Sequence, residues 1–382
     1  MKADRATHDA IKNASDEKAA ANGCRFEESR GRDAVDWIER YCKLYEGELA
    51  GQPLRLLDWQ LDTTLRLFGW VRHSAKWGRA VRRFRQASIW VAKKNGKTPT
   101  LAAWGLYLLC GDGEPGAKVF LAARDGRQAR ELAGKHAVEM LLASAELSAE
   151  CSLNRNTQTI THLPTRSIMQ PLSSANSRTQ QSKEGLNGSV LIDETHVVDA
   201  EFVSRISRAG ISRSEPLQIE VSTAGNNPDS YGRGRFDHAL QVESGAAEDQ
   251  ELLAIVHAAP QDVSDEDLDR NPDRYGRLAN PAWGRLIDPE EYRRDYQQSK
   301  TRGITELAEF KMYRLNVWAK GANPWLRASD WDACRREFTE ADLEGGCCWA
   351  GLDLSRTRDM TALVLVFRGD EDEEYNLLPY YW

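Results

Sequence analysis

The sequence contains no apolar run that approaches the length of a membrane-spanning helix, and its amino-terminal residues are polar and charged. A transmembrane segment or a secretory signal peptide would need such a run. The seven cysteines form no CxxC pair, and the adjacent Cys347 and Cys348 do not have the spacing of metal ligands. These absences predict a cytoplasmic protein with reduced thiols and no membrane partner.

The sequence also lacks an excess of positive charge, because it has 51 Lys and Arg residues and 58 Asp and Glu residues, which give a net charge of −7. This balance argues against a uniformly basic nucleic-acid-binding protein. The exception is the segment from Arg72 to Lys97, which has nine Lys or Arg residues and no Asp or Glu. Such a basic segment in an acidic protein indicates a phosphate-rich ligand. A solvated helix or loop over residues 79–85 would give the same pattern.

A phosphate-binding loop is predicted at the end of this basic segment. Residues 88–92 suit a buried strand, and residues 101–109 favour a helix. In such a loop the backbone N–H groups surround an anion, a lysine reaches the outer phosphates and a threonine hydroxyl binds Mg²⁺. Val91 stands where the usual pattern has glycine, so a second motif is needed to support the first. The residues expected around the nucleotide are Lys93, Lys94, Asn95, Gly96, Lys97 and Thr98.

The second motif is the aliphatic run from Ser189 to Ile192, which ends in the adjacent carboxylates Asp193 and Glu194. A strand buried in a parallel sheet is apolar throughout, and ligands bind at its carboxyl end. In nucleoside triphosphatases with a phosphate-binding loop, the first acid holds Mg²⁺ and a following glutamate orients the attacking water. A strand that ends in a solvated acidic turn is the alternative. Both motifs in this order favour a nucleoside triphosphatase.

Two further candidates flank these motifs. Gln60 precedes the loop, and its amide both donates and accepts hydrogen bonds, which suits the edge of an adenine. A glutamine on a helix surface is the alternative. The small residues Ser222, Thr223, Ala224 and Gly225 follow another predicted strand and would be placed to sense the γ-phosphate. A plain turn between strand and helix explains them equally well.

Strands and helices alternate over residues 31–260, which predicts an α/β fold with a mostly parallel sheet and helices on both faces. Residues 1–30 contain few large apolar side chains and predict a flexible or loosely docked tail. The acidic stretch over residues 260–281 interrupts the alternation, two helices are expected at 289–299 and 306–318, and 321–324 is a plausible hinge.

The last residues change character. Three apolar strands are predicted at residues 349–355, 360–367 and 377–382, and the first of them contains Asp353. An aspartate there, with Ser355 and Asp359 after it, would begin a two-metal nuclease site. Three strands are too few for a stable sheet, and we expect this domain to be cut off partway.

Taken together, the chain from about Trp37 onward resembles the large terminase subunit of tailed bacteriophages, the motor that packages DNA into a procapsid. Residues 93–98, Lys-Lys-Asn-Gly-Lys-Thr, are similar to that family's variant P-loop, which often lacks the first glycine. Residues 190–196, Val-Leu-Ile-Asp-Glu-Thr-His, resemble its Walker B strand with the catalytic glutamate. Residues 57–60 resemble the family's adenine-contacting motif, and residues 222–225 resemble its coupling motif. Residues 314–318 resemble its linker region, and residues 351–355 resemble the start of its nuclease domain.

The resemblance implies a RecA/ASCE-like P-loop ATPase domain at 31–260, a linker or helical subdomain at 261–345 and the start of a ribonuclease H-like nuclease domain at 346–382. ATP and Mg²⁺ would be bound, with Lys97 and Glu194 catalytic and with Thr98 and Asp193 at the Mg²⁺. Asp353 would be the first ligand of a nuclease Mg²⁺ or Mn²⁺, in a nuclease that is expected to be incomplete.

The family also implies double-stranded DNA, portal protein and small terminase subunit as partners, with a homo-oligomeric ring on the portal in the host-cell cytoplasm. An arginine completes the ATPase site, often from a neighbouring subunit, and the candidates in this sequence are Arg124, Arg127, Arg178 and Arg205. A helicase-like P-loop ATPase and an inactive prophage remnant with only a binding role are the alternatives.

Overall fold

The computed structural model describes residues 5–124, 126–173, 187–206, 210, 212–319, 333–354, 360–369 and 374–382, without the side chains of Gly126, Leu132 and Arg205. The chain divides into two compact units, Met1–Pro324 (unit 1) and Trp325–Trp382 (unit 2). Among the described residues no helix is long and apolar enough to span a membrane.

Unit 1 is built on an eight-stranded sheet with the order β11-β4-β10-β9-β5-β8-β7-β6. All neighbouring pairs from β11 to β8 are parallel, and only β7 runs antiparallel to its neighbours β8 and β6. The predicted α/β fold with a mostly parallel sheet is therefore confirmed. The strands, in chain order, are β4 (Gln86–Trp90), β5 (Lys118–Ala123), β6 (Cys151–Asn154), β7 (Thr159–His162), β8 (Ser167–Ser173), β9 (Ser189–Asp193), β10 (Gln218–Ser222) and β11 (Leu252–Val256).

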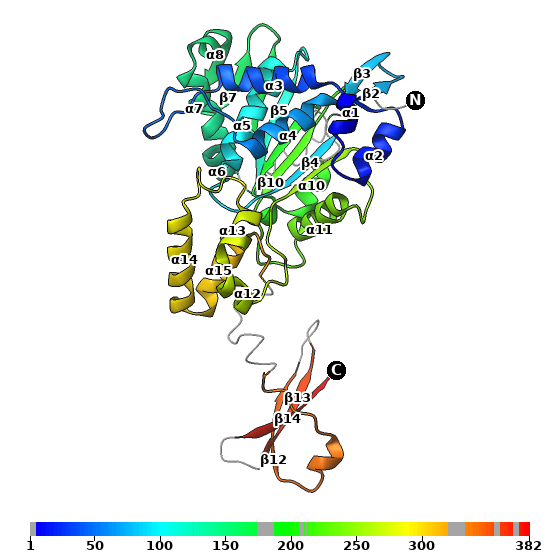
Figure 1. Cartoon of the computed structure of the whole chain (residues 1–382), viewed down its shortest axis with the longest axis vertical. Coiled ribbons are helices and arrows are strands. Elements are labelled where there is room, and N and C mark those ends of the chain that lie inside the picture. The colour runs from blue at the N-terminus through cyan, green and yellow to red at the C-terminus, as the bar shows by residue number, and fades with distance from the viewer. Residues whose placement is uncertain are drawn as a thin grey trace. The chain divides into compact units, whose positions relative to one another are not determined.

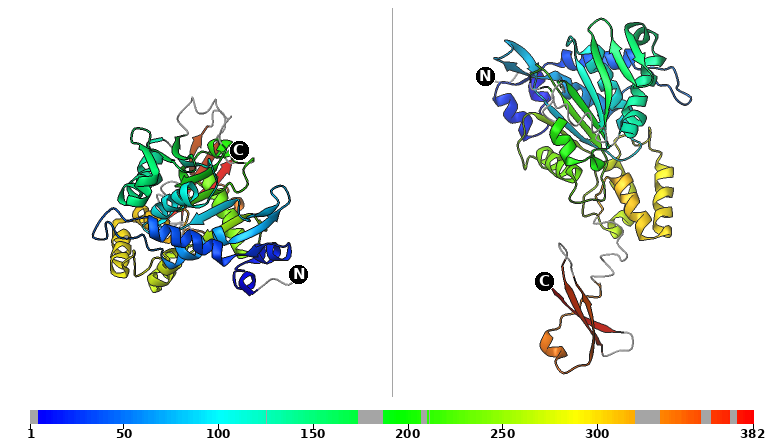
Figure 2. Two further views of the ribbon diagram at one scale, coloured as in Figure 1. Left: turned by 90° about the horizontal axis from the view of Figure 1, so that it is seen from above. Right: turned by 180° about the vertical axis from the view of Figure 1, so that it is seen from behind.

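Helices cover both faces of this sheet (Figures 1 and 2). The helices that share the largest apolar core with one face are α3 (Glu28–Tyr41), α4 (Asp58–Gly69), α5 (Lys97–Leu106), α7 (Lys135–Ala143) and α8 (Ala145–Glu150). The other face is covered by α10 (Ala200–Ile206) and α11 (Tyr231–Ser244), which pack in two smaller clusters. Short helical segments extend α5 and precede α7, namely η1 (Tyr107–Gly111), α6 (Gly126–Ala129) and η2 (Arg130–Gly134).

A group of four helices lies at the end of the sheet where β4 gives way to the phosphate-binding loop (Figure 1). Its members are α12 (Asp265–Arg270), α13 (Pro272–Ala279), α14 (Pro289–Arg302) and α15 (Ile304–Leu315), with a buried core of their own. The first two occupy the acidic stretch that interrupts the strand–helix alternation, where no individual helix was predicted. They form because Ser264 and Asn271 accept hydrogen bonds from Asp267 N and Arg274 N as N-caps, and Pro272 starts α13.

The amino-terminal residues are part of unit 1, so the expectation of a flexible tail over residues 1–30 is wrong where they are described. They form α1 (Arg5–Asp9), α2 (Ala14–Ala21) and β1 (Arg25–Phe26), and β1 pairs with β2 (Trp70–Ser74), which pairs with β3 (Arg79–Arg82). Asp16 of α2 is 1% exposed, with ion pairs to Arg66 at 3.0 Å and Arg83 at 2.7 Å. Composition missed this docking because it depends on one buried carboxylate.

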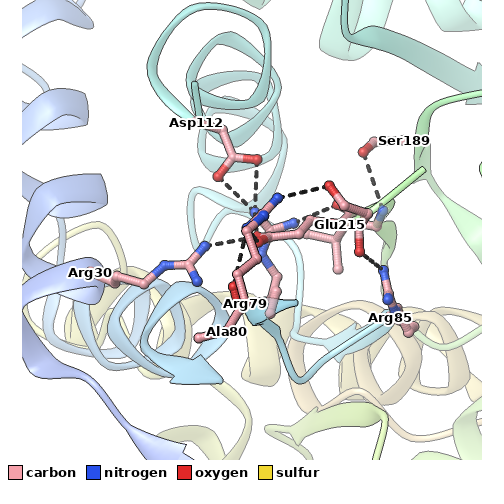
Figure 3. Close-up of polar contacts among 10 residues, drawn as sticks. Arg30, Arg79, Ala80, Arg85, Asp112, Ser189 and Glu215 are labelled. Atoms are coloured by element: carbon pink, nitrogen blue, oxygen red, sulfur yellow. Dashed lines mark hydrogen bonds and ion pairs between the residues drawn. The ribbon is translucent and has the colours of Figure 1, made fainter. Parts of the chain in front are cut away.

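The part of the basic segment over residues 79–85 is neither a ligand site nor a solvated loop, because several of its arginines bond to protein groups. Figure 3 shows the arginines around Glu215, whose carboxylate accepts from Arg30 and Arg79 at 2.7 Å each. Arg82, fully buried, donates to both oxygens of Asp112 at 2.7 and 2.8 Å. Burial acts to raise the pKa of the Glu215 carboxyl, but the arginines around it, Arg82 first, hold it below its usual range.

Unit 2 contains η4 (Glu340–Leu343) and an antiparallel sheet of β12 (Cys348–Asp353), β13 (Ala362–Arg368) and β14 (Tyr375–Tyr381), in that order. The three predicted strands are confirmed. Many of its apolar side chains are exposed, Trp349 at 64% and Leu352 at 61% among them. The predicted hinge at 321–324, Ser355 and Asp359 lie outside the described residues.

Candidate nucleotide site

The phosphate-binding loop connects β4 to α5, as the sequence predicts. Gly96 is the N-cap of α5 and has a φ of 83°, which an L side chain rarely adopts. A Cβ at this position would lie 2.8 Å from Gln60 Nε2, so only glycine fits there without a shift. Lys97 starts the helix and is 6% exposed. The free N–H groups of the first turn of α5 and the Lys97 ammonium together favour an anion at this position.

The sheet register brings the acidic strand to the same place. β10 lies between β4 and β9, with Ser222 opposite Trp90 and Val221 opposite Asp193. The carboxyl ends of the three strands therefore meet beside the loop. The Glu194 carboxylate lies 3.7 Å from Lys97 Nζ, across this meeting point.

Asp193 is 1% exposed, and one of its carboxylate oxygens accepts from Glu194 N at 3.0 Å. The other oxygen, Oδ2, is buried and has no hydrogen-bond partner among the described residues. Complete burial and then the negative charge of Glu194 raise the pKa of the Asp193 carboxyl, and Lys97 and the Thr98 hydroxyl offset part of this rise. A buried carboxylate oxygen without a partner is costly unless a cation completes its environment.

Glu194 differs from its neighbour in its electrostatic surroundings. Burial acts to raise the pKa of its carboxyl, but Lys97 foremost, with His196 and Lys93, lowers it, so Glu194 is the carboxylate of the pair that stays ionised. Its φ is 55°, in the left-handed region, which is uncommon for a residue with a side chain. Strain of this kind is often found at functional sites.

These residues fit a magnesium ion by the chemistry of their donors. Mg²⁺ binds oxygen ligands, usually one or two carboxylates plus phosphates and waters. The unpartnered oxygen of Asp193 and the nearby Thr98 hydroxyl are such ligands, beside the loop that would hold the phosphates.

The residues at the carboxyl end of β10 contact Glu194 through His196. His196 Nδ1 lies 3.2 Å from Glu194 Oε2 and 3.0 Å from Ser222 Oγ, which also accepts from His196 N. Ser222 and Thr223 are fully buried, Ala224 N donates to Asn316 Oδ1 at 2.6 Å, and Gly225 lies against His196. Of the four residues predicted here, Ser222 and Gly225 thus lie against His196, whereas the bonds given for Thr223 and Ala224 go to Ala224 O and Asn316. His196 is a contact that sequence reasoning did not single out.

Three of the predicted nucleotide-binding side chains have protein partners. Gln60 Oε1 accepts from Leu57 N at 2.8 Å, and its Nε2 lies 3.4 Å from Gly96 O, so it lies beside the loop and caps α4. Lys93 Nζ lies 3.3 Å from the centre of the Tyr313 ring, and Lys94 is exposed with a φ of 70°. The Asn95 side chain bonds to Asn280, so any contribution of Asn95 to nucleotide binding would come from its backbone.

The four candidate arginines stay undecided. Arg127 of α6 donates from Nε to Glu131 Oε1 of the following segment η2 at 2.6 Å, and Arg124 is exposed. Arg178 and the side chain of Arg205 lie outside the described residues.

The predicted nuclease ligand has a different environment. Asp353 is the last residue of β12, is exposed and pairs with Ala362. In the part of the chain that the structure describes, no group of three or more His, Cys, Asp or Glu side chains could hold a metal ion. Asp359, the other acid predicted for the nuclease site, lies outside the described residues.

Comparison with known proteins identifies the family. The model "Terminase large subunit, ATPase domain" matches residues 58–237, and "Terminase large subunit, endonuclease domain" matches residues 255–380. The second match starts before the α12–α15 group, which the structure places in unit 1. The large terminase subunit of Enterobacteria phage HK97 is 26% identical over 358 residues, which are 93% of this chain and 65% of that protein.

The crystal structure of the HK97 large terminase superimposes with a TM-score of 0.62 at 24% identity, over 92% of this chain and 68% of that one. This likeness shows that the two chains share a fold. The chain spans less than two thirds of the length of the HK97 protein in the sequence comparison. The two family models between them cover most of the chain, and we conclude that it belongs to the terminase large-subunit family.

Proposed function

We propose that unit 1 is an ATPase that moves double-stranded viral DNA into a procapsid. The observation that carries this proposal is the meeting of Lys97, Glu194 and the unpartnered oxygen of Asp193 at the carboxyl ends of β4, β9 and β10. Family membership supplies the DNA-packaging role, because the same ATPase chemistry also serves other motors.

The residues divide the work of hydrolysis. Lys97 and the N–H groups of the loop bind the β- and γ-phosphates of ATP, and Thr98 and Asp193 hold Mg²⁺. When bound, Mg²⁺ neutralises phosphate charge that develops during the reaction. Glu194, kept ionised by Lys97, accepts a hydrogen bond from the attacking water and orients it toward the γ-phosphate.

Ser222, Thr223, Ala224 and Gly225 are proposed to couple hydrolysis to DNA movement. The first of them, Ser222, lies close to the proposed water-orienting group, since Ser222 Oγ and Glu194 Oε2 contact the same His196 ring. A shift of Glu194 after loss of the γ-phosphate would therefore move the end of β10. Gln60 is proposed to contact the adenine after release of one of its present backbone bonds.

The family supports further proposals for the complete assembly. The partners would be DNA, the portal protein and the small terminase subunit, with a homo-oligomeric ring on the portal in the host cytoplasm. An arginine from a neighbouring subunit would complete each site. Unit 2 would contribute to a metal-dependent endonuclease through Asp353, and both terminase models argue for this assembly over a helicase.

The test is ATP hydrolysis by the purified chain with Mg²⁺, with and without double-stranded DNA. Glu194→Gln keeps the size of the side chain and removes its charge, so turnover should fall by about 10²–10⁴-fold while ATP still binds. Lys97→Ala should weaken ATP binding as well. Asp199→Asn is the control, because this carboxylate caps the start of α10 through Glu201 N at 2.8 Å, outside the site.

Undiminished turnover in either Glu194→Gln or Lys97→Ala would disprove the assignment. Tight Mg²⁺-ATP binding without turnover in the wild type would instead indicate a pocket that needs a neighbouring subunit's arginine.

A further inference from the structure

The phosphate-binding loop is held from two sides. On one side it continues β4 and α5. On the other, its backbone bonds to the α12–α15 group: Lys93 N donates to Tyr313 O at 2.9 Å, and Ala92 N lies 3.4 Å from Ala279 O. The conformation of the loop therefore depends on helices that lie more than 180 residues further along the chain.

Asn95 makes the most specific of these connections. Its Nδ2 donates to Asn280 Oδ1 at 2.8 Å and to Ala92 O at 3.1 Å, and its Oδ1 accepts from Ala282 N at 3.0 Å. Both Asn95 and Asn280 are 0% exposed. Since buried amides are costly to leave unpaired, neither side chain can turn away without loss. The Asn95–Asn280 pair thus fixes the loop one residue before Gly96.

Asn280 passes this connection to two helices. Its Nδ2 donates to Gly276 O in α13 at 2.8 Å and to Arg314 O in α15 at 2.7 Å. Two residues after Arg314, the fully buried Asn316 accepts from Ala224 N at 2.6 Å and donates to His257 O at 2.9 Å. The carboxyl end of α15 is therefore in contact with the phosphate-binding loop through Asn280 and with the end of β10 through Asn316.

We propose that Asn280 is a positioning residue for the nucleotide site: it holds the phosphate-binding loop through Asn95 and transmits changes in that loop to the carboxyl end of α15. This rests on the proposed ATPase function and extends it to a residue outside the recognised motifs. Phosphate binding rearranges the loop, and because the Asn95–Asn280 pair is buried and fully bonded, the end of α15 moves with it. In the sequence, α15 is followed by unit 2, which begins at Trp325.

Two substitutions at the pair and one control test the proposal. Asn280→Ala removes all three bonds, whereas Asn280→Asp keeps an acceptor for Asn95 and loses the two donations to carbonyls. Asn271→Ala weakens the same helix α13 at its N-cap, where Asn271 Oδ1 accepts from Arg274 N and the side chain does not bond to the loop. Thermal unfolding of each variant gives the structural effect separately.

The first measurement is calorimetric binding of ATP with Mg²⁺ at a temperature where every variant is folded. We expect Asn280→Ala to raise the dissociation constant about tenfold or more, and Asn280→Asp to raise it at least as much because a buried carboxylate oxygen would face two carbonyl oxygens. Asn271→Ala should stay within about twofold. Asn95→Ala combined with Asn280→Ala should cost no more than the larger single effect, because both remove one connection.

The second measurement is hydrogen exchange of residues 311–318, which should slow on addition of Mg²⁺-ATP in the wild type and not in Asn280→Ala. If Asn280→Ala bound ATP as tightly as the wild type and only its unfolding temperature were lower, the Asn95–Asn280 pair would serve stability alone. That result would overturn the proposal. A wild-type chain that binds no ATP at all would instead remove the proposed function, and the inference with it.

Discussion

Replacing Asp16 by alanine should destabilise unit 1 strongly, because this carboxylate is the shared partner of two buried guanidinium groups. It lies 3.0 Å from Arg66 and 2.7 Å from Arg83, which are 6% and 1% exposed. Removing one member of a buried ion pair typically costs about 3–5 kcal/mol, since the charge that remains stays buried without compensation.

The surroundings of the two arginines decide where in this range the value lies. Arg83 keeps hydrogen bonds from Nε to Gln250 O at 2.7 Å and from Nη2 to Ser15 O at 3.1 Å, so its charge stays partly solvated by carbonyls. Arg66 Nε, by contrast, is buried and has no partner among the described residues. We therefore expect a loss of about 3 kcal/mol in the free energy of unfolding, mostly from Arg66.

Urea unfolding followed by tryptophan fluorescence at neutral pH measures this loss. The matched control is Asp9→Ala in the same segment, where the pair with Arg5 at 3.9 Å is exposed and should be worth less than about 1 kcal/mol. A loss of less than about 1 kcal/mol for Asp16→Ala would show that the amino-terminal helices are not docked through this carboxylate.

Two further predictions follow from buried or strained groups. Burial lowers the pKa of His257 to about 4, so the unfolded chain, with a pKa of 6.5, binds the proton first and stability falls as pH drops from 6.5 toward 4. His257→Phe should remove about 1–3 kcal/mol of this loss at pH 4, and the lower figure allows for the partly exposed ring. If the free energies of unfolding of wild type and variant fell in parallel between pH 6.5 and pH 4, His257 would not be the cause. Gly96→Ala should cost about 1–2 kcal/mol in unfolding free energy and weaken ATP binding. The alanine would have to adopt a φ of 83°, and its Cβ would lie 2.8 Å from Gln60 Nε2. Gly78→Ala, with a φ of 62° and no atom within 4 Å, has the strain without the contact, and an equal loss of ATP affinity there would disprove the explanation.

The parts of the fold that depend on local sequence could be predicted. The apolar runs at β4, β5 and β9 are strands because they are buried on both faces, and their ends carry the nucleotide-site residues. The acidic helices α12 and α13 were missed although their N-caps Ser264 and Asn271 stand in the sequence. Their residues are mostly polar, so periodicity gave little signal, and packing against α14 and α15 stabilises them.

The basic segment shows why charge patterns alone do not locate a ligand. Arg79 and Lys97 belong to the same run of positive charge in the sequence, yet Arg79 bonds to Glu215 and Lys97 faces Glu194. Glu215 follows far along the chain and could not be assigned as a partner from sequence. The two differ in their place in the fold, because Lys97 starts α5 after β4 whereas Arg79 lies in β3.

In the candidate nucleotide site, too, some residues could be singled out from local sequence, whereas the partners of others depend on the tertiary fold. Lys97, Thr98, Asp193 and Glu194 could be singled out from the sequence because the roles proposed for them need specific residue types at fixed distances from strand ends. Asn95 looked like another nucleotide ligand, but its amide is bonded to Asn280, a residue 185 positions away. A buried amide takes whichever partner the tertiary fold supplies, and no local pattern marks that partner. For this reason the connection between the phosphate-binding loop and α15 becomes visible only in the structure, where Asn280 donates to Arg314 O and Asn316 accepts from Ala224 N within one turn of the same helix end.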